Sequence, residues 1–220
     1  MTTFKIGIIG TGWIAERMAE TLTGMEGVEK FAVASRTQKK ADTFAKQWGF
    51  NRSYGSYEAL VNDDDIDLVY IATPHSHHYD NVKMCLLAGR NVLCEKAFTA
   101  NARQAEELIA LAHERNIFLT EAIWTRYQPF RKTISELIDS GIIGNVHQLS
   151  ANLCYPNIDK PRMYLPELAG CALLDIGVYA LNFAAMFFGS DYKIVSSSCQ
   201  LTDTGVDATN TMTLHWADGR

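Results

Sequence analysis

Two pairs of ionisable side chains have types and spacing that suit proton transfer. Glu95 and Lys96 directly follow a short apolar run, and Asp175 and Tyr179 stand four residues apart in an apolar helical pattern. A lysine at the end of a strand can relay a proton or supply positive charge, and positions i and i+4 share one face of a helix. Gly177, within the second pair, is expected to leave room for a ligand. Lys96, Asp175 and Tyr179 are therefore candidate catalytic residues, although such residues more often form a surface ion pair or ordinary positions on a helix face.

A glycine-rich turn near the N-terminus has the spacing of a dinucleotide-binding loop, Gly10-Thr11-Gly12-Trp13-Ile14-Ala15. Gly10 permits a tight turn, Gly12 lets the backbone approach a pyrophosphate, and Ala15 is small enough for close helix packing. The start of the following helix offers unpaired N–H groups and a positive dipole end to phosphates. We expect the first five of these residues to contact the cofactor, although the same sequence can form a turn that binds nothing.

The segment after the second predicted strand indicates which dinucleotide is preferred. An acidic residue at this place would hold the adenosine 2′-OH and repel a 2′-phosphate. The chain instead has Ser35 and Arg36, with Lys39 and Lys40 close by. Cations can bind an extra phosphate, so NADP(H) is favoured over NAD(H), with Ser35, Arg36 and Lys40 as contacts. A solvated basic helix start is the alternative.

Alternating strand and helix patterns run from the N-terminus to about residue 121. The predicted strands are residues 4–9, 29–35, 67–72, 91–94 and 117–121, and the predicted helices are residues 13–22, 38–48, 78–88 and 102–112, the last capped by Asn101. This alternation predicts an α/β domain over residues 1–121, with a doubly wound parallel sheet covered by helices on both faces.

After residue 122 the pattern changes, which predicts a second, α+β domain over residues 122–220 with antiparallel strands. Strand-like runs occupy residues 146–153, 195–201 and 208–216, and helices are expected near residues 130–140 and 171–188. The last strand leads into Asp218-Gly219, a pair favoured in hairpin turns, and the chain stops at Arg220. We therefore expect the domain to be truncated.

Composition narrows the class of protein. The 220 residues carry 25 acidic and 20 basic side chains, a net charge of −5. The chain therefore has no positive electrostatic field that would attract nucleic acid or anionic lipid. We expect that no apolar stretch approaches the roughly 18 to 20 residues of a membrane span. Five dispersed cysteines without a CxxC pair predict reduced thiols and a cytoplasmic location.

Three histidines form an H-x-H-H cluster, His75, His77 and His78. Histidine is a common metal ligand, but no carboxylate or further histidine accompanies the cluster at ligand spacing. We expect no metal site.

Taken together, these motifs resemble those of the glucose-fructose oxidoreductase/inositol dehydrogenase (Gfo/Idh/MocA) family. The resemblance rests on the order and spacing of the glycine turn, of Ala72-Thr-Pro-His-Ser-His-His78, of Glu95-Lys96 and of Asp175-x-Gly-x-Tyr179, and it covers essentially the whole chain. Trp124-Thr-Arg-Tyr127, together with Tyr179, is most similar to the dihydrodiol dehydrogenase branch. The resemblance implies a C-terminal domain with a large antiparallel sheet and a homodimer.

The resemblance implies a role for each matching residue near the nicotinamide. Thr73, Pro74 and His78 match the strand-end segment beside the nicotinamide ribose. Glu95 matches the residue that bonds this ribose, and Lys96 matches the catalytic lysine.

The remaining matches concern the substrate and the 2′-phosphate. Asp175 and Tyr179 match the substrate-facing pair, and Arg36 and Lys40 match basic residues of the NADP-using branch. The family commonly has a proline, often cis, after the lysine, but this chain has Ala97 there. A cis bond costs about 2.5 to 4 kcal/mol before alanine, compared with about 0.5 to 1 kcal/mol before proline.

These roles lead to a hypothesis for the reaction. NADP+ would accept a hydride from a carbinol carbon of a polyol, sugar or cyclic diol while Tyr179 takes the hydroxyl proton. A free phenol has a pKa near 10 and needs a nearby cation, for which Lys96 is the candidate, and Asp175 would orient the substrate hydroxyls or Lys96. A nucleotide-binding regulator or scaffold of the same fold is the alternative.

Further residues are expected to shape the substrate pocket. Trp124, Arg126, Tyr127 and Arg162 would give a polar pocket with an aromatic wall, which suits a pentose, a hexose or a dihydrodiol equally. Trp124 is also expected to contact the cofactor.

Overall fold

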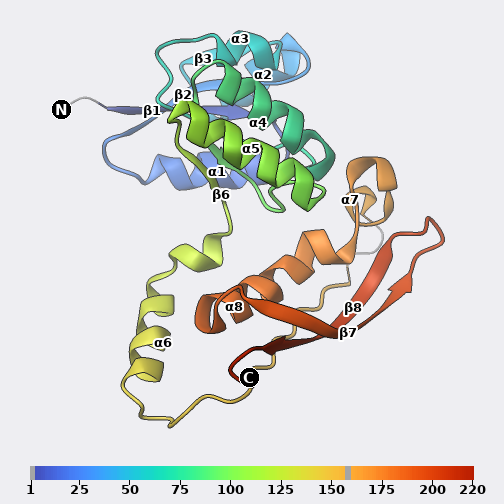
Figure 1. The fold of residues 1–220 in the computed structure, drawn as a ribbon. Coiled ribbons are helices and arrows are strands. Elements are labelled where there is room, and N and C mark those ends of the chain that lie inside the picture. Colours follow the sequence, from blue (N-terminus) through green and yellow to red (C-terminus); the bar gives the residue numbers. More distant parts are fainter. Residues whose placement is uncertain (1–2, 157–159) are drawn as a thin grey trace. The chain divides into compact units, whose positions relative to one another are not determined.

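The computed structural model describes residues 3–156 and 160–220. Two compact units make up the chain, Met1–Ala122 and Ile123–Arg220, and Figure 1 labels most of their helices and strands. Each unit is described by itself below.

The first unit contains a six-stranded sheet in the order β3-β2-β1-β4-β5-β6. Every neighbouring pair of strands is parallel. The strands are β1 (Phe4–Ile9), β2 (Val28–Ala34), β3 (Arg52–Tyr54), β4 (Leu68–Ile71), β5 (Asn91–Cys94) and β6 (Leu119–Glu121). The two central strands consist mainly of apolar residues because both of their faces are buried. The predicted doubly wound α/β fold is confirmed.

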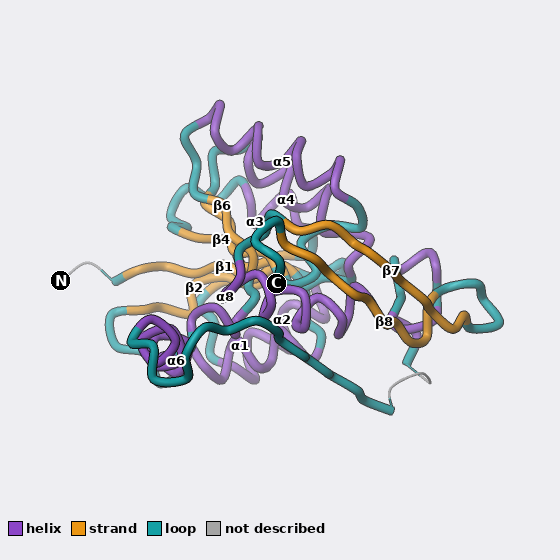
Figure 2. The backbone as a smooth tube through the Cα atoms, turned by 60° about the horizontal axis from the view of Figure 1, so that its bottom comes forward, coloured by secondary structure: helices purple, strands orange, loops and turns teal. Residues whose placement is uncertain are grey.

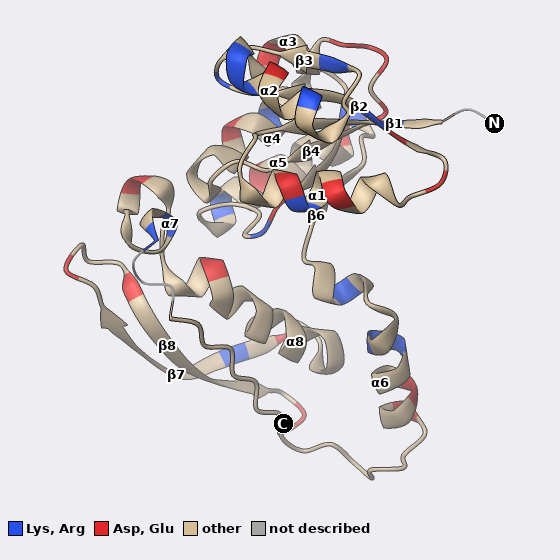
Figure 3. Ribbon diagram, turned by 180° about the vertical axis from the view of Figure 1, so that it is seen from behind, with Lys and Arg blue, Asp and Glu red and all other residues tan. Residues whose placement is uncertain are grey.

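Helices cover both faces of this sheet, as Figure 2 shows. α1 (Trp13–Thr23) and α2 (Gln38–Trp48) contribute to one apolar core, and α3 (Tyr57–Val61), α4 (His78–Leu87) and α5 (Ala102–Arg115) contribute to the other. The Asn101 side chain accepts a hydrogen bond from the Gln104 amide, so Asn101 caps α5 as predicted. Figure 3 shows that acidic and basic residues are interspersed along these helices.

The order of the strands places several loops at one edge of the sheet. The chain leaves β1 toward β2 on one side and returns to β4 on the other, so the strand order reverses between β1 and β4. In parallel sheets, ligands bind at the carboxyl ends of the strands near such a reversal. The loops after β1, β2, β4 and β5 all begin at this edge, and they contain Gly10, Ser35, Thr73 and Glu95.

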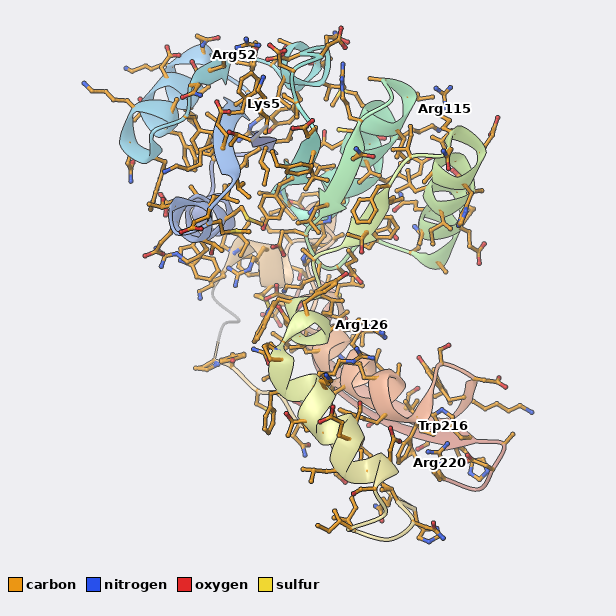
Figure 4. The ribbon with its side chains drawn as sticks, turned by 90° about the vertical axis from the view of Figure 1, so that its left-hand side faces the viewer. Lys5, Arg52, Arg115, Arg126, Trp216 and Arg220 are labelled. Carbon is orange, nitrogen blue, oxygen red and sulfur yellow. The ribbon has the colours of Figure 1, made fainter. Side chains whose placement is uncertain are left out.

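The second unit combines short helices with one antiparallel hairpin. Its elements are η2 (Trp124–Tyr127), α6 (Pro129–Asp139), α7 (Pro161–Tyr164), η3 (Pro166–Leu168), η4 (Leu173–Gly177), α8 (Val178–Phe188), β7 (Tyr192–Leu201) and β8 (Asp207–Trp216). Trp216, labelled in Figure 4, packs edge-on against Phe188 with ring centroids 5.2 Å apart. Its indole N–H donates to the Gly189 carbonyl at 3.0 Å. These contacts fix the end of β8 against the end of α8.

Three predictions about individual elements were wrong or incomplete. Residues 146–153 form no strand, because a strand needs a pairing partner and none of the described residues pairs with them. The short elements β3 and α3 were missed. The helix predicted at residues 171–188 begins as the π-helical turn η4 and becomes α-helical only at Val178.

The expectation that no apolar stretch reaches the length of a membrane span was also wrong. The segment Pro166–Phe188 has 23 residues and contains an 18-residue stretch with a mean hydropathy of 1.7, so it is long and apolar enough for a span by length and composition. An average over 18 residues stays high even though Asp175 interrupts the apolar residues. Core helices of soluble proteins can be equally long and apolar. In this chain, 22% of the 18-residue stretch is buried. Length and composition alone are therefore weak evidence for a membrane segment.

Candidate functional site

The glycine turn after β1 has the geometry that a bound pyrophosphate needs. Gly10 has a φ of 107°, and a Cβ on it would lie 2.7 Å from the Ala72 carbonyl oxygen. Only glycine fits there without strain. Apart from Gly12 and its neighbours along the chain, no heavy atom of the described residues lies within 4 Å of the place where a Gly12 Cβ would be. Gly12 is also the N-cap of α1, so the N–H groups of the first turn face this open space.

The residues expected beside the adenosine phosphate lie at the end of β2. Ser35 is buried, and its hydroxyl lies 3.2 Å from the Thr11 hydroxyl, which joins this loop to the glycine turn. Arg36, Lys39 and Lys40 are exposed at the start of α2. Cations are unfavourable at a helix N-terminus unless an anion is bound there. The arrangement therefore suits an anionic group.

Glu95 and Lys96 follow β5 at the same edge of the sheet. The two carboxylate oxygens of Glu95 accept hydrogen bonds from the Tyr70 hydroxyl and from the Lys96 backbone N–H, the latter at 3.1 Å. Burial raises the pKa of Glu95, and these two bonds, together with the Lys96 charge, oppose the increase. The Lys96–Ala97 peptide bond is cis.

His78, the first residue of α4, is fully buried. Its Nδ1 lies 2.8 Å from the Ala97 carbonyl oxygen, and its Nε2 lies 2.8 Å from the Thr73 carbonyl oxygen. Burial lowers the pKa of His78, while the hydrogen bonds to these carbonyls oppose the change. Asn81, one turn further along α4, donates to the Thr73 hydroxyl at 3.0 Å. His78 thus influences the site by holding the backbone carbonyls of Thr73 and Ala97 in place. Pro74, the residue after Thr73, is exposed.

In the second unit, Asp175 lies in η4 and is buried. Its carboxylate is 3.6 Å from the Arg162 guanidinium, which is half-exposed. The predicted room beside Gly177 is absent, because a Cβ there would lie 3.0 Å from Leu173 Cδ1. The Leu173 side chain, four residues earlier on the same face of the helix, fills this space.

Tyr179 and Trp124 are hydrogen-bonded within the second unit. The Trp124 indole N–H donates to the Tyr179 hydroxyl oxygen at 2.9 Å, and the two rings meet edge-on with centroids 5.9 Å apart. Arg126 Nε donates to Asn182 Oδ1 at 2.8 Å, one turn further along α8. Arg126 lies beside α8 in Figure 4. η2 therefore contacts one face of α8 and fixes the phenol.

Several residues around these groups were not found from the sequence. Tyr70 and Glu121 are strand residues whose neighbours depend on the register of the sheet, and Asn81 and Asn182 are polar residues within the helices α4 and α8. Of these residues, only Asn81 could have been found from the sequence, because it stands one helical turn after His78. Among residues 3–156 and 160–220, no group of three or more His, Cys, Asp or Glu side chains is arranged to hold a metal ion.

Two family models match the chain. Residues 4–122 match the oxidoreductase family with an NAD-binding Rossmann fold, and residues 132–220 match the GFO/IDH/MocA C-terminal domain. Both models describe one family, and they match in the order in which its two domains occur along the chain.

Proteins similar to this chain include named dehydrogenases. Trans-1,2-dihydrobenzene-1,2-diol dehydrogenase of Xenopus laevis is 40% identical over 98% of this chain and 66% of its own length. D-xylose 1-dehydrogenase (NADP(+)) of Hypocrea jecorina is 43% identical over 82% of this chain and 52% of its own length. The chain thus spans about two thirds, or less, of the length of these relatives.

A solved structure agrees with this relationship. KijD10, a 3-ketoreductase from Actinomadura kijaniata in complex with TDP-benzene and NADP, matches 99% of this chain and 66% of its own, with a TM-score of 0.87 and 31% identity. The match includes both the Rossmann sheet and the second unit. The chain therefore belongs to the Gfo/Idh/MocA family of oxidoreductases.

Proposed function

We propose that the protein is an NADP-dependent oxidoreductase that transfers a hydride between the nicotinamide and a carbinol carbon of a sugar or cyclic diol. The observation that carries the proposal is the open space at Gly12, faced by the start of α1 at the sheet edge where Glu95 and Lys96 also lie. Family membership supports the reaction class. The names of the relatives, a dihydrodiol dehydrogenase, a xylose dehydrogenase and a ketoreductase, support the substrate class.

The residues that would hold the cofactor lie on three loops of the first unit. Gly12 and the first turn of α1 would bind the pyrophosphate, with Thr11, Trp13 and Ile14 beside it. Arg36 and Lys40 would bind the 2′-phosphate, which favours NADP(H). A bound nicotinamide supplies the hydride acceptor or donor. Thr73, Pro74 and Glu95 would border its ribose, and His78 would hold Thr73 in place.

Proton transfer falls to Tyr179 in this proposal. Since Trp124 N–H donates to the phenolic oxygen, the phenol's own proton points to another acceptor, and negative charge on that oxygen is stabilised when the proton leaves. Lys96 would supply positive charge to the reacting groups. Asp175, held by Arg162, would orient the substrate hydroxyls.

Three further features stay predictions. We propose a cytoplasmic location, because all five cysteines are free. A homodimer and the absence of nucleic-acid or membrane partners also stay predictions.

Turnover assays test the proposal. NADPH formation is measured with NADP+ and a panel of pentoses, hexoses and trans-dihydrodiols, on the wild type and on Lys96→Met and Tyr179→Phe. We expect turnover in the wild type and a loss of about 100-fold or more in kcat in each variant, with little change in NADP(H) affinity. Tight NADPH binding without turnover on any member of the panel would instead support the nucleotide-binding regulator.

A further inference from the structure

Three successive residues of the turn that carries Lys96 have a backbone group in contact with a side chain of the first unit. The Lys96 N–H donates to the Glu95 carboxylate at 3.1 Å. The Ala97 carbonyl lies 2.8 Å from His78 Nδ1. The Phe98 N–H donates to Glu121 Oε1 at 2.9 Å. A charged acceptor makes the last of these a strong bond.

Glu121 reaches this turn because of the register of the sheet. It is the last residue of β6 and lies opposite Cys94, the last residue of β5. The Ala122 N–H donates to the Cys94 carbonyl at 2.7 Å, so the backbone on both sides of Glu121 is fixed against the end of β5. Neither the sequence motifs nor the proposed mechanism gives Glu121 a function.

The charges of this region act on one another. Glu121 raises the pKa of Glu95, and Lys96 lowers it, so both charges lie near the Glu95 carboxylate. The side chains of Glu95, Lys96 and Glu121 are all half-buried, where such interactions are less screened than at the surface. Glu121 therefore has two separable properties, namely a hydrogen-bond acceptor for Phe98 and a negative charge near Lys96.

We propose that Glu121 is a positioning residue, which holds the turn of residues 95–98 through the Phe98 N–H and so directs Lys96 into the cofactor site. The inference rests on the proposed function, because Lys96 is the group to be positioned. A displacement of about 1 Å in a catalytic group can cost about 100-fold in rate. The fixed turn would supply the required accuracy.

Three substitutions separate the hydrogen bond from the charge. Glu121→Gln keeps the length and the acceptor but loses the charge. Glu121→Asp keeps the charge but is one methylene too short, and Glu121→Leu loses both. We expect kcat to remain within about threefold of the wild type in Glu121→Gln and to fall about 100-fold in the other two, with KM for NADP+ changed by less than about threefold in all of them. Glu114→Leu, an exposed position on α5, is the control and should match the wild type.

The kinetic result decides between the two properties. If Glu121→Gln loses as much activity as Glu121→Leu, the hydrogen bond does not explain the role of Glu121, and the inference is wrong. Unchanged kcat in both Glu121→Leu and Glu121→Asp would also overturn it. Should Glu121→Leu fail to fold, the comparison of Glu121→Asp with Glu121→Gln carries the test.

A second measurement does not depend on turnover. Hydrogen exchange of the Phe98 amide, followed by NMR, should be slow in the wild type and in Glu121→Gln and about tenfold faster or more in Glu121→Asp and Glu121→Leu. If the wild type has no turnover, the proposed function fails, and the Phe98 amide still reports whether Glu121 holds the turn. Equal exchange in all variants would contradict the positioning role.

Discussion

The indole N–H of Trp124 donates a hydrogen bond to the hydroxyl of Tyr179 at 2.9 Å. The pair is formed between η2 and α8, 55 residues apart in sequence, and the edge-on contact of the two rings supports it. The bond fixes the position of the phenolic oxygen and supplies a donor to any negative charge that forms there. Trp124 thus serves the proposed proton-transfer residue directly, while its predicted contact with the cofactor stays a prediction.

Replacing Trp124 tests this pairing. Trp124→Phe keeps an aromatic ring but removes the N–H donor, so we expect kcat to fall about 10- to 100-fold, because a hydrogen bond to a charged oxygen contributes about 1.5 to 3 kcal/mol. Tyr179→Phe should lose more. Trp124→Phe kinetics indistinguishable from the wild type would mean that this donor does not act on the phenol. The melting temperature checks that the variants remain folded.

The two glycines of the turn should respond differently to alanine. Gly10→Ala meets the Ala72 carbonyl and has a positive φ, so we expect the free energy of unfolding to decrease by about 1 to 3 kcal/mol. Gly12→Ala enters open space and should fold normally, but its methyl group would keep the pyrophosphate away and weaken NADPH binding more than about tenfold. Denaturant unfolding and fluorescence titration with NADPH separate the two effects. Wild-type NADPH affinity in Gly12→Ala would contradict the assignment of the pyrophosphate site.

Arg36 should determine the preference between the two cofactors. Arg36→Ala removes a charge-assisted contact to the 2′-phosphate, so we expect the Kd for NADPH to increase about 10- to 100-fold and the Kd for NADH to stay constant. Lys46→Ala, at the exposed last turn of α2, is the matched control. Equal weakening of both cofactors would show that Arg36 does not contact the 2′-phosphate.

The half-buried carboxyl of Glu95 should make stability depend on pH. Burial raises the pKa of Glu95 above its ordinary 4.5. At a pH between 4.5 and the folded-state pKa, the carboxyl is therefore protonated in the folded chain and ionised in the unfolded chain. This contribution to stability is fully present below pH 4.5 and is lost as the pH rises through the folded-state pKa. We therefore expect the melting temperature of Glu95→Gln to rise relative to the wild type from pH 4 toward neutrality. Glu114→Gln, at an exposed position, should follow the wild type, and a constant offset for Glu95→Gln would contradict the raised pKa.

The sequence predicted the elements whose signal is local. Apolar runs identified β1, β4 and β5, glycine spacing identified the turn after β1, and Asn101 identified the start of α5. The three-residue strand β3 and the five-residue helix α3 are too short to show a period. Residues 146–153 have a strand pattern, but pairing decides whether a strand forms.

The site was predictable where a motif lies along the chain, and not where it depends on packing. Glu95 and Lys96 were found because they follow a strand. The contact of Glu121 with Phe98 depends on the register of β5 and β6, and the bond between Trp124 and Tyr179 depends on how η2 packs on α8. The space at Gly177 was predicted wrongly because the Leu173 side chain, four residues earlier on the same face, occupies it.

The most direct test of the central claim is a thermal-shift titration of this chain with NADP(H) and NAD(H) in parallel. A ligand that binds only the folded state raises stability by RT ln(1 + [L]/Kd). We predict a larger increase in melting temperature with NADP(H) than with NAD(H), and loss of that difference in Arg36→Ala. A larger increase with NAD(H) would contradict the NADP preference, and no increase with either cofactor would contradict the proposal that the glycine turn binds a dinucleotide.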